Sequence, residues 1–182
     1  VTRLAKFMRE LKAKGVTHVG IEALVENYPK SDDKRNHPYY RYFLAAQHWA
    51  ERTGIKLVQI EDPIAQKMSR LMTQHKLDTW TEREQLKIRG VNYGMFSSRE
   101  IEDLHSGIHY FRSMKMHERA KRMKSETNIV GNAHAADLKK PHIEIIELES
   151  LPEGNEPKRA RENFKKYGRL IMRMYRNLSR GR

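Results

Sequence analysis

Two side chains that could do chemistry, Glu22 and His134, each stand just past a short apolar run. The run 128–130, with β-branched residues at 129 and 130, closes at a glycine and is typical of a strand that ends in a tight turn. The run 16–21 leads to Glu22 in the same way. In open α/β folds ligands bind at the carboxyl ends of the strands, so we expect both side chains at one edge of a sheet. A carboxylate beside an imidazole suits general acid–base catalysis or supplies two ligands to a divalent metal. The alternative for His134 is a local hydrogen bond that caps the following turn.

Alternating strands and helices must position these residues. Apolar runs predict strands at 16–21, 55–60, 128–131 and 141–148. Helical periodicity predicts helices at 2–14, 39–53, 63–75, 81–91, 98–124 and 158–179. This alternation is typical of a parallel sheet covered on both faces. We therefore expect an α/β fold with about four or more parallel strands, helices on both faces, and a basic amphipathic helix at the C-terminus.

Capping residues mark the start of two of these helices. Asp62 before Pro63 suits an N-cap. Ser97 followed by Glu100 resembles a capping box. Gly107 lies inside the helix that follows and weakens that prediction.

Length, charge and cysteine content limit the classes of function. The chain of 182 residues suits one α/β domain at 1–150, with 151–182 as a linker and a basic helix packed on the domain or extending from it. The absence of cysteine excludes disulfides, thiolate metal sites and a cysteine nucleophile. No apolar run is long enough for a transmembrane helix, and the N-terminal segment lacks an apolar signal core, so we expect a cytoplasmic protein. The sequence leaves the oligomeric state open.

Four positions carry a resemblance to a known superfamily. A Gly-x-x-His motif runs from Gly131 to His134, a helix with Arg119 precedes it, and an early strand ends in Glu22. This arrangement, over residues 1–148, resembles the TraB / erythromycin esterase / ChaN-like superfamily, which includes the TIKI metalloproteases. The resemblance implies a metal-dependent hydrolase with Mn, Co or Zn, in which Glu22 and His134 serve as ligands or acid–base groups. It also implies that Arg119 orients a carboxylate or stabilises negative charge, and that Gly131 shapes the turn.

The sequence departs from the superfamily pattern in two ways. Members usually have an earlier strand with a Gly-x-x-His of its own, whereas this sequence begins in the helix that would follow it. We expect either that this piece was removed or that the protein has lost half of the site and acts as an interaction protein. TraB-type members often carry C-terminal membrane segments, and this sequence shows none. Members include an esterase, a haem-binding protein and metal-dependent peptidases, so the resemblance leaves the reaction open.

A second candidate for metal binding is the pair His105 and His109, four residues apart on a predicted helix with Glu102 nearby. The pair could share one helix face. However, residue 106 is serine, where the zincin pattern His-Glu-x-x-His requires glutamate. The motifs of serine hydrolases with a nucleophile elbow, of P-loop proteins and of dinucleotide-binding folds are absent from the sequence, which disfavours those enzyme classes.

The C-terminal helix offers a function of a different class. The net charge is +13, and residues 151–182 hold ten Lys and Arg against three acids. Basic side chains surround an apolar stripe at 164–178, which must pack on the body, on a partner or on a membrane. The alternative function is therefore a non-catalytic module that binds RNA, DNA or another polyanion. Its candidate contacts are Arg159, Arg161, Lys165, Lys166, Arg169, Arg173 and Arg176.

Overall fold

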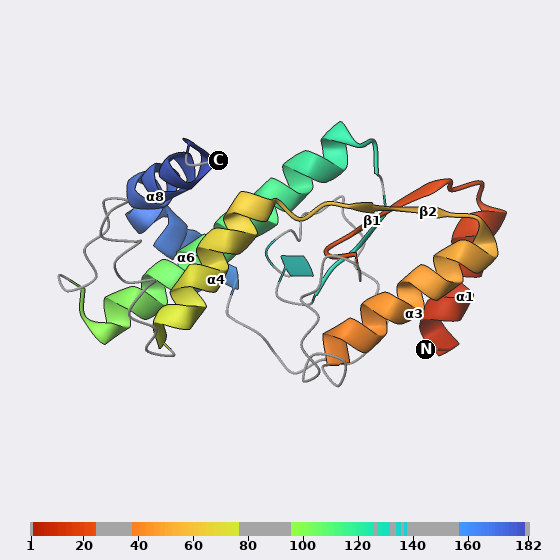
Figure 1. Ribbon diagram of the computed structural model, residues 1–182, viewed down its shortest axis with the longest axis horizontal. Coiled ribbons are helices and arrows are strands. Elements are labelled where there is room, and N and C mark those ends of the chain that lie inside the picture. Colours follow the sequence, from red (N-terminus) through yellow and green to blue (C-terminus); the bar gives the residue numbers. More distant parts are fainter. Residues whose placement is uncertain are drawn as a thin grey trace. The chain divides into compact units, whose positions relative to one another are not determined.

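The structure, a computed structural model, describes residues 2–24, 38–76, 96–125, 127–131, 134, 135, 137 and 157–180. Within these residues the chain has five helices and a three-stranded parallel sheet (Figure 1). The chain divides into two compact units, which we call the sheet unit and the helical unit. The sheet unit comprises Val1–Glu61, Met116–Gly131 and Glu144–Pro152, and the helical unit comprises Asp62–Lys115, Asn132–Ile143 and Glu153–Arg182.

The sheet is parallel throughout, as the alternation of strands and helices predicts. The central strand β1 is His18–Ile21, and it lies between β2, Lys56–Gln59, and β3, Asn128–Ile129. In the parallel pairing of β1 with β2, Val19 stands opposite Leu57. The α/β class and three of the predicted strands are thus confirmed, whereas the fourth predicted strand, 141–148, and the predicted helix 81–91 lie outside the described residues.

Two helices lead into strands through glycine turns. Helix α1 spans Thr2–Ala13 and is followed by Gly15, and α3 spans Pro38–Thr53 and is followed by Gly54. Both glycines adopt positive φ, 76° and 70°, which is the left-handed conformation that closes a helix. In each case the next residue donates its N–H to a carbonyl five residues back at 3.0 Å. The same turn therefore aims both strands into the sheet.

Helices cover both faces of the sheet. Val19 and Ile21 lie on one face, in a core with residues of α1 and α3. On the other face Ile60 packs against Met116 and Ala120. Met116 and Ala120 belong to the last turns of α6, which spans Ser98–Arg122. This arrangement fits the expectation of a sheet covered on both sides.

The helical unit is built from α4, Pro63–Lys76, the N-terminal part of α6, and α8, Pro157–Arg180. Its buried core is formed by Ala65, Met68, Leu71, Leu104, Ile108, Phe111, Tyr167, Ile171, Met174 and Leu178. The apolar stripe of α8 therefore packs on α4 and α6. Each of the two units is made of segments that alternate along the chain. They do not test the predicted domain boundary near residue 150, which stays a prediction.

The capping predictions are confirmed. Asp62 Oδ1 accepts the backbone N–H groups of Ile64 and Ala65 at 3.0 and 2.9 Å. At the start of α6, the carboxylate of Glu100 accepts the Ser97 N–H at 2.9 Å, and the Ser97 hydroxyl accepts the Glu100 N–H at 3.3 Å. The hydrogen bond from the Ser97 backbone lowers the pKa of Glu100.

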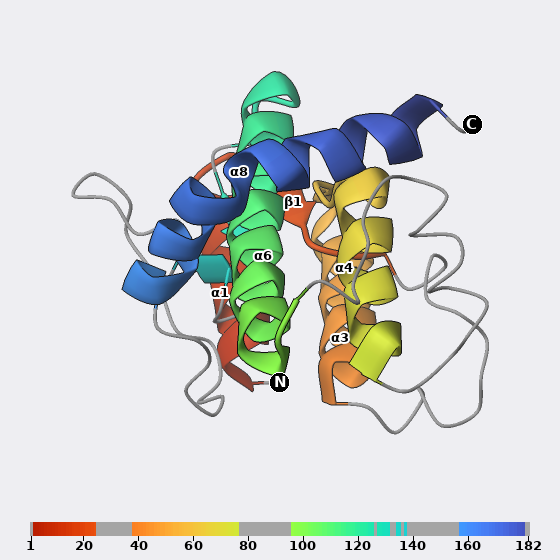
Figure 2. The same cartoon turned by 90° about the vertical axis from the view of Figure 1, so that its left-hand side faces the viewer.

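Gly107 marks the point where α6 and α8 cross (Figure 2). A Cβ at this position would lie 3.1 Å from backbone atoms of both Asn163 and Phe164. Because glycine has no side chain, the backbones of α6 and α8 can approach closely here. Helix α6 continues unbroken through the glycine. None of the helices that the structure describes is long and apolar enough to cross a membrane.

Candidate metal centre

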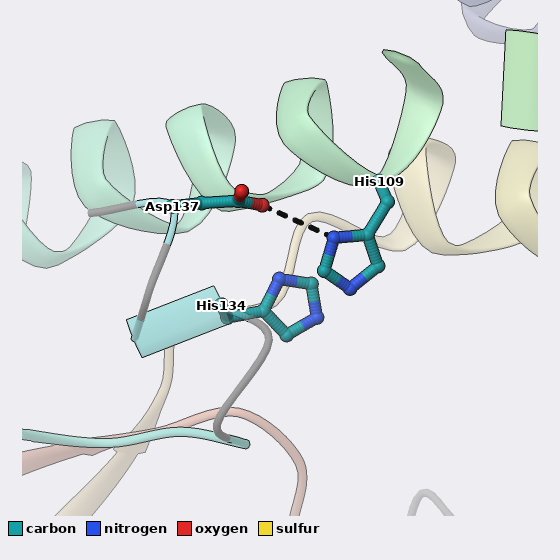
Figure 3. A group of neighbouring side chains, drawn as sticks. All are labelled: His109, His134 and Asp137. Atoms are coloured by element: carbon teal, nitrogen blue, oxygen red, sulfur yellow. Dashed lines mark hydrogen bonds and ion pairs between the residues drawn. The ribbon is translucent and has the colours of Figure 1, made fainter. Parts of the chain in front are cut away.

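Four polar side chains converge inside the helical unit. His109 and Ser113 lie one turn apart on α6. His134 and Asp137 come from helical backbone three residues apart and lie beside His109 (Figure 3). Residues one turn apart share one side of a helix, so each element delivers a pair of side chains to the same place. His134, Ser113 and the Asp137 side chain are buried, and the His109 side chain is 14% exposed.

Short hydrogen bonds join these four residues. Ser113 Oγ lies 2.7 Å from Asp137 Oδ2 and 2.8 Å from His134 Nδ1. His109 Nδ1 lies 3.1 Å from the same Asp137 oxygen. The two imidazole rings stack with their centroids 4.1 Å apart and their planes inclined by 8°. The carboxylate of Asp137 is therefore the acceptor that organises the cluster.

The hydrogen bonds assign the protons of His134. A serine hydroxyl has one proton, and the contact with Asp137 Oδ2 is the shortest that it makes in this cluster. With the hydroxyl proton given to the carboxylate, the contact between Ser113 and His134 must be donated by the imidazole Nδ1. His134 then carries its proton on Nδ1 and presents a lone pair at Nε2.

Burial keeps His134 neutral. Loss of hydration, and to a lesser degree the charge of Arg112 and the proximity of His109, lower the pKa of His134 to about 2. A neutral imidazole is the form that binds metals, whereas such a weak base is poorly suited to accept a proton at neutral pH. The environment therefore favours a ligand role for His134 over a general-base role.

His109, His134 and Asp137 could hold a metal ion. One ligand atom from each lies within 4.8 Å of the other two. Ligands at Zn–N and Zn–O distances near 2.1 Å stand about 3.4 Å apart around a tetrahedral ion. The contact of 3.1 Å between His109 and Asp137 already matches that spacing. The widest separation needs to close by no more than about 1.4 Å, which a side-chain rotation can supply.

The predicted site residues fall in both units. Glu22 and Gly131 meet in the sheet unit, where Glu22 Oε2 accepts the Gly131 N–H at 2.9 Å. Arg119 also belongs to the sheet unit, and its Nε is buried without a hydrogen-bond partner among the described residues. His134 belongs to the helical unit. The pairing of Glu22 with His134 at one sheet edge stays a prediction.

Asp137 and Ser113 join the cluster although neither is among the predicted site residues. Their spacing in the sequence could have indicated them, because Asp137 follows His134 by three residues and Ser113 follows His109 by four, and such residues share one side of a helix. His109 itself was a candidate, but with His105 as its partner. Among the described residues the group that could hold an ion contains His109 and does not contain His105. The partner of His109 comes from a segment distant in sequence.

The basic residues predicted on the C-terminal helix are all exposed on α8. Two of them have partners within the unit. Arg159 Nη2 lies 2.9 Å from Asp103 Oδ1, and the Lys166 ammonium lies 4.8 Å from the centre of the Tyr167 ring. The contact with Arg159 lowers the pKa of Asp103. These two cations help to hold α8 in place.

The superfamily resemblance is the remaining pointer to a family. Neither protein-family models, nor curated proteins, nor solved structures give a match to this chain. Membership of the TraB / erythromycin esterase / ChaN-like superfamily therefore stays a prediction.

Proposed function

We propose that the protein is a metal-dependent hydrolase of the TraB / erythromycin esterase / ChaN-like kind, with a divalent ion held by His109, His134 and Asp137. The observation that carries the proposal is the convergence of these three ligands, from two segments separated in sequence, within 4.8 Å. Two imidazoles and one carboxylate are a common protein ligand set for zinc and for other first-row divalent metals, and they leave coordination positions open.

The polar surroundings of the three residues support this role. Ser113 holds both His134 and Asp137, so it acts as a positioning residue for two ligands at once. Such hydrogen bonds fix ring orientation and typically change metal affinity by about 10- to 100-fold. The negative charge of Asp137 offsets the positive charge of Arg112, which is close enough to influence His134. A bound ion would give the cluster a net positive charge.

A positive cluster suits hydrolysis of esters, amides or phosphoesters. When bound, a divalent ion supplies Lewis acidity to a substrate oxygen. The resemblance implies that Arg119 orients a carboxylate or stabilises negative charge, and the buried Arg119 Nε in the sheet unit lacks a hydrogen-bond partner within the described residues. Glu22 fixes the backbone at Gly131 through its carboxylate. The resemblance implies a different role for Glu22, that of a ligand or an acid–base group.

Metal titration of the purified chain tests the proposal. After treatment with a chelator and removal of the chelator, calorimetric titration with Mn²⁺, Co²⁺ or Zn²⁺ should show one ion bound per chain. His109→Ala, His134→Ala and Asp137→Asn should each weaken binding by about 100-fold or more, since each removes one of three ligands. Retention of full affinity in all three variants would overturn the proposed centre.

A matched control separates this centre from unspecific imidazole binding. His48 is exposed on α3 and lies outside the cluster, so His48→Ala should bind the metal like the wild type. Circular dichroism of each variant should show the wild-type helix content. Asp137→Asn keeps the side-chain volume and tests the ligand set even if a substitution of the buried His134 unfolds the unit.

Hydrolysis of activated esters tests the reaction class. The metal-loaded protein should cleave 4-nitrophenyl acetate or bis(4-nitrophenyl) phosphate, and a chelator or Asp137→Asn should abolish cleavage. Stoichiometric metal binding without cleavage of carboxylic ester, amide or phosphate ester probes would support the metal centre but contradict hydrolase activity.

A further inference from the structure

Helix α8 presents a straight row of positive charge. Lys165, Arg169, Arg173, Arg176 and Arg180 follow one another at steps of three or four residues, so they lie along one side of the helix. All five are exposed. We call this row the cationic ridge. At 1.5 Å per residue it extends over about 22 Å.

Within the described part of the chain, no ion pair joins any of the five residues of the cationic ridge to a carboxylate. Arg159 on the same helix differs, because Asp103 binds it. Like charges one turn apart destabilise a helix by a few tenths of a kcal/mol per pair. A ligand with regularly spaced negative charges would neutralise these cations and relieve their mutual repulsion.

The opposite side of α8 is already engaged. Tyr167, Ile171 and Met174 are buried in the core of the helical unit. An amphipathic helix that binds a membrane inserts its apolar side into the lipid. Because that side of α8 packs on α4 and α6, charge alone remains to attract an external partner.

The cationic ridge also lacks the features of a protein interface. Protein partners are held mainly by apolar and aromatic residues at the centre of the contact. Among the described residues the exposed large hydrophobic side chains are Leu44 and Met123, and neither belongs to α8. Uniform charge on a fixed rod instead matches a phosphodiester backbone, which carries charge at regular intervals.

We propose that the cationic ridge of α8 binds the phosphate backbone of nucleic acid without reading its bases. This binding is independent of the metal centre and stands whether or not the protein hydrolyses a substrate. The contacts are electrostatic, and each neutralised phosphate releases condensed counterions. Five such contacts give a plot of log affinity against log salt a slope of about −4.5 for duplex DNA and about −3.5 for single strands.

Fluorescence anisotropy with a labelled 20-base-pair DNA and a 20-nucleotide single-stranded RNA tests the inference with the full chain. Between 50 and 200 mM KCl, affinity for the duplex should fall about 500-fold. The triple variant Arg169→Gln, Arg173→Gln, Arg176→Gln should bind more weakly at 50 mM KCl. Its duplex affinity should fall only about 12-fold over the same range, because two contacts remain.

A control variant removes the same charge elsewhere. Arg3, Lys14 and Lys56 are exposed in the sheet unit, so their triple change to Gln should leave affinity and salt slope near the wild-type values. Equal weakening by both triple variants would assign binding to net charge and overturn the inference. Salt-independent binding would overturn it as well. So would absence of binding to both nucleic acids, including the case in which phosphatidylserine vesicles bind instead.

Discussion

His109 and His134 stack as nearly parallel rings, with planes 8° apart and centroids separated by 4.1 Å. The lone pair of an imidazole nitrogen lies in the ring plane, so two parallel rings aim their lone pairs side by side. One ring must therefore turn before both can bind the same ion. The contacts with Asp137 and Ser113 hold the rings in this arrangement. An ion bound at His134 Nε2 would leave the hydrogen bond from His134 Nδ1 to Ser113 in place.

Ser113→Ala should weaken metal binding by about 10- to 100-fold and leave its stoichiometry unchanged. The hydroxyl contacts both His134 and Asp137, so its loss frees two ligands to adopt other rotamers. Calorimetric titration measures this effect. Ser179→Ala is the matched control, because the hydroxyls of both serines also lie against the carbonyl four residues back in a helix. Equal loss of affinity in the two variants would contradict a positioning role for Ser113.

The metal-free protein should lose stability as the pH falls below about 6.5. The pKa of His134 is about 2 in the folded state and near 6.5 when the chain is unfolded, so between these values the unfolded state binds one more proton. The free energy of unfolding then rises with pH, by up to about 1.4 kcal/mol per pH unit. Urea unfolding of the chelator-treated chain at pH 5 to 7 measures this slope.

Comparison of two variants tests whether His134 causes this dependence of the free energy of unfolding on pH. His134→Asn removes the buried imidazole and should flatten the pH dependence, while His48→Ala should keep it. The same steep slope in His134→Asn would show that another group causes the loss of stability.

Gly107→Ala should destabilise the protein by about 1 to 3 kcal/mol. The added Cβ would press on the backbone at Asn163 and Phe164, which belongs to a rigid helix and cannot rotate away. Gly168→Ala on α8 is the control, since the nearest atom to its Cβ is 4.0 Å away and alanine favours a helix by about 1 kcal/mol over glycine. The urea concentration at the midpoint of unfolding should therefore fall for Gly107→Ala and rise for Gly168→Ala. A stabilising Gly107→Ala would show that α6 and α8 cross less closely.

Glu22→Gln should cost about 1 to 2 kcal/mol of unfolding free energy, because a charged acceptor of the Gly131 N–H becomes neutral. Metal stoichiometry should stay at one ion per chain if Glu22 acts on the backbone alone. Denaturant unfolding and calorimetric titration of the same sample separate the two effects. Loss of the metal with unchanged stability would instead place Glu22 among the ligands, as the superfamily resemblance implies.

Local signals predicted most of the elements correctly. Asp62, the Ser97–Glu100 pair, Gly15 and Gly54 set helix ends through contacts within a few residues, and such contacts are already present in the sequence. Three of the predicted strands match the structure within one or two residues, and the fourth, 141–148, lies outside the described residues. Gly107 was the exception, because the atoms that require a glycine there come from another helix.

The sequence by itself determined the α/β class, the helix boundaries and the basic, amphipathic character of the last helix, because hydrophobic periodicity and capping act over short distances along the chain. Only the tertiary structure decided that His134 meets His109, Ser113 and Asp137, because no local rule fixes which faces of distant segments pack together. It likewise decided that the apolar side of α8 is buried, which leaves the basic side chains of this helix exposed. Long-range packing selects these partners through buried area and satisfied hydrogen bonds, and these exist only once the chain has folded.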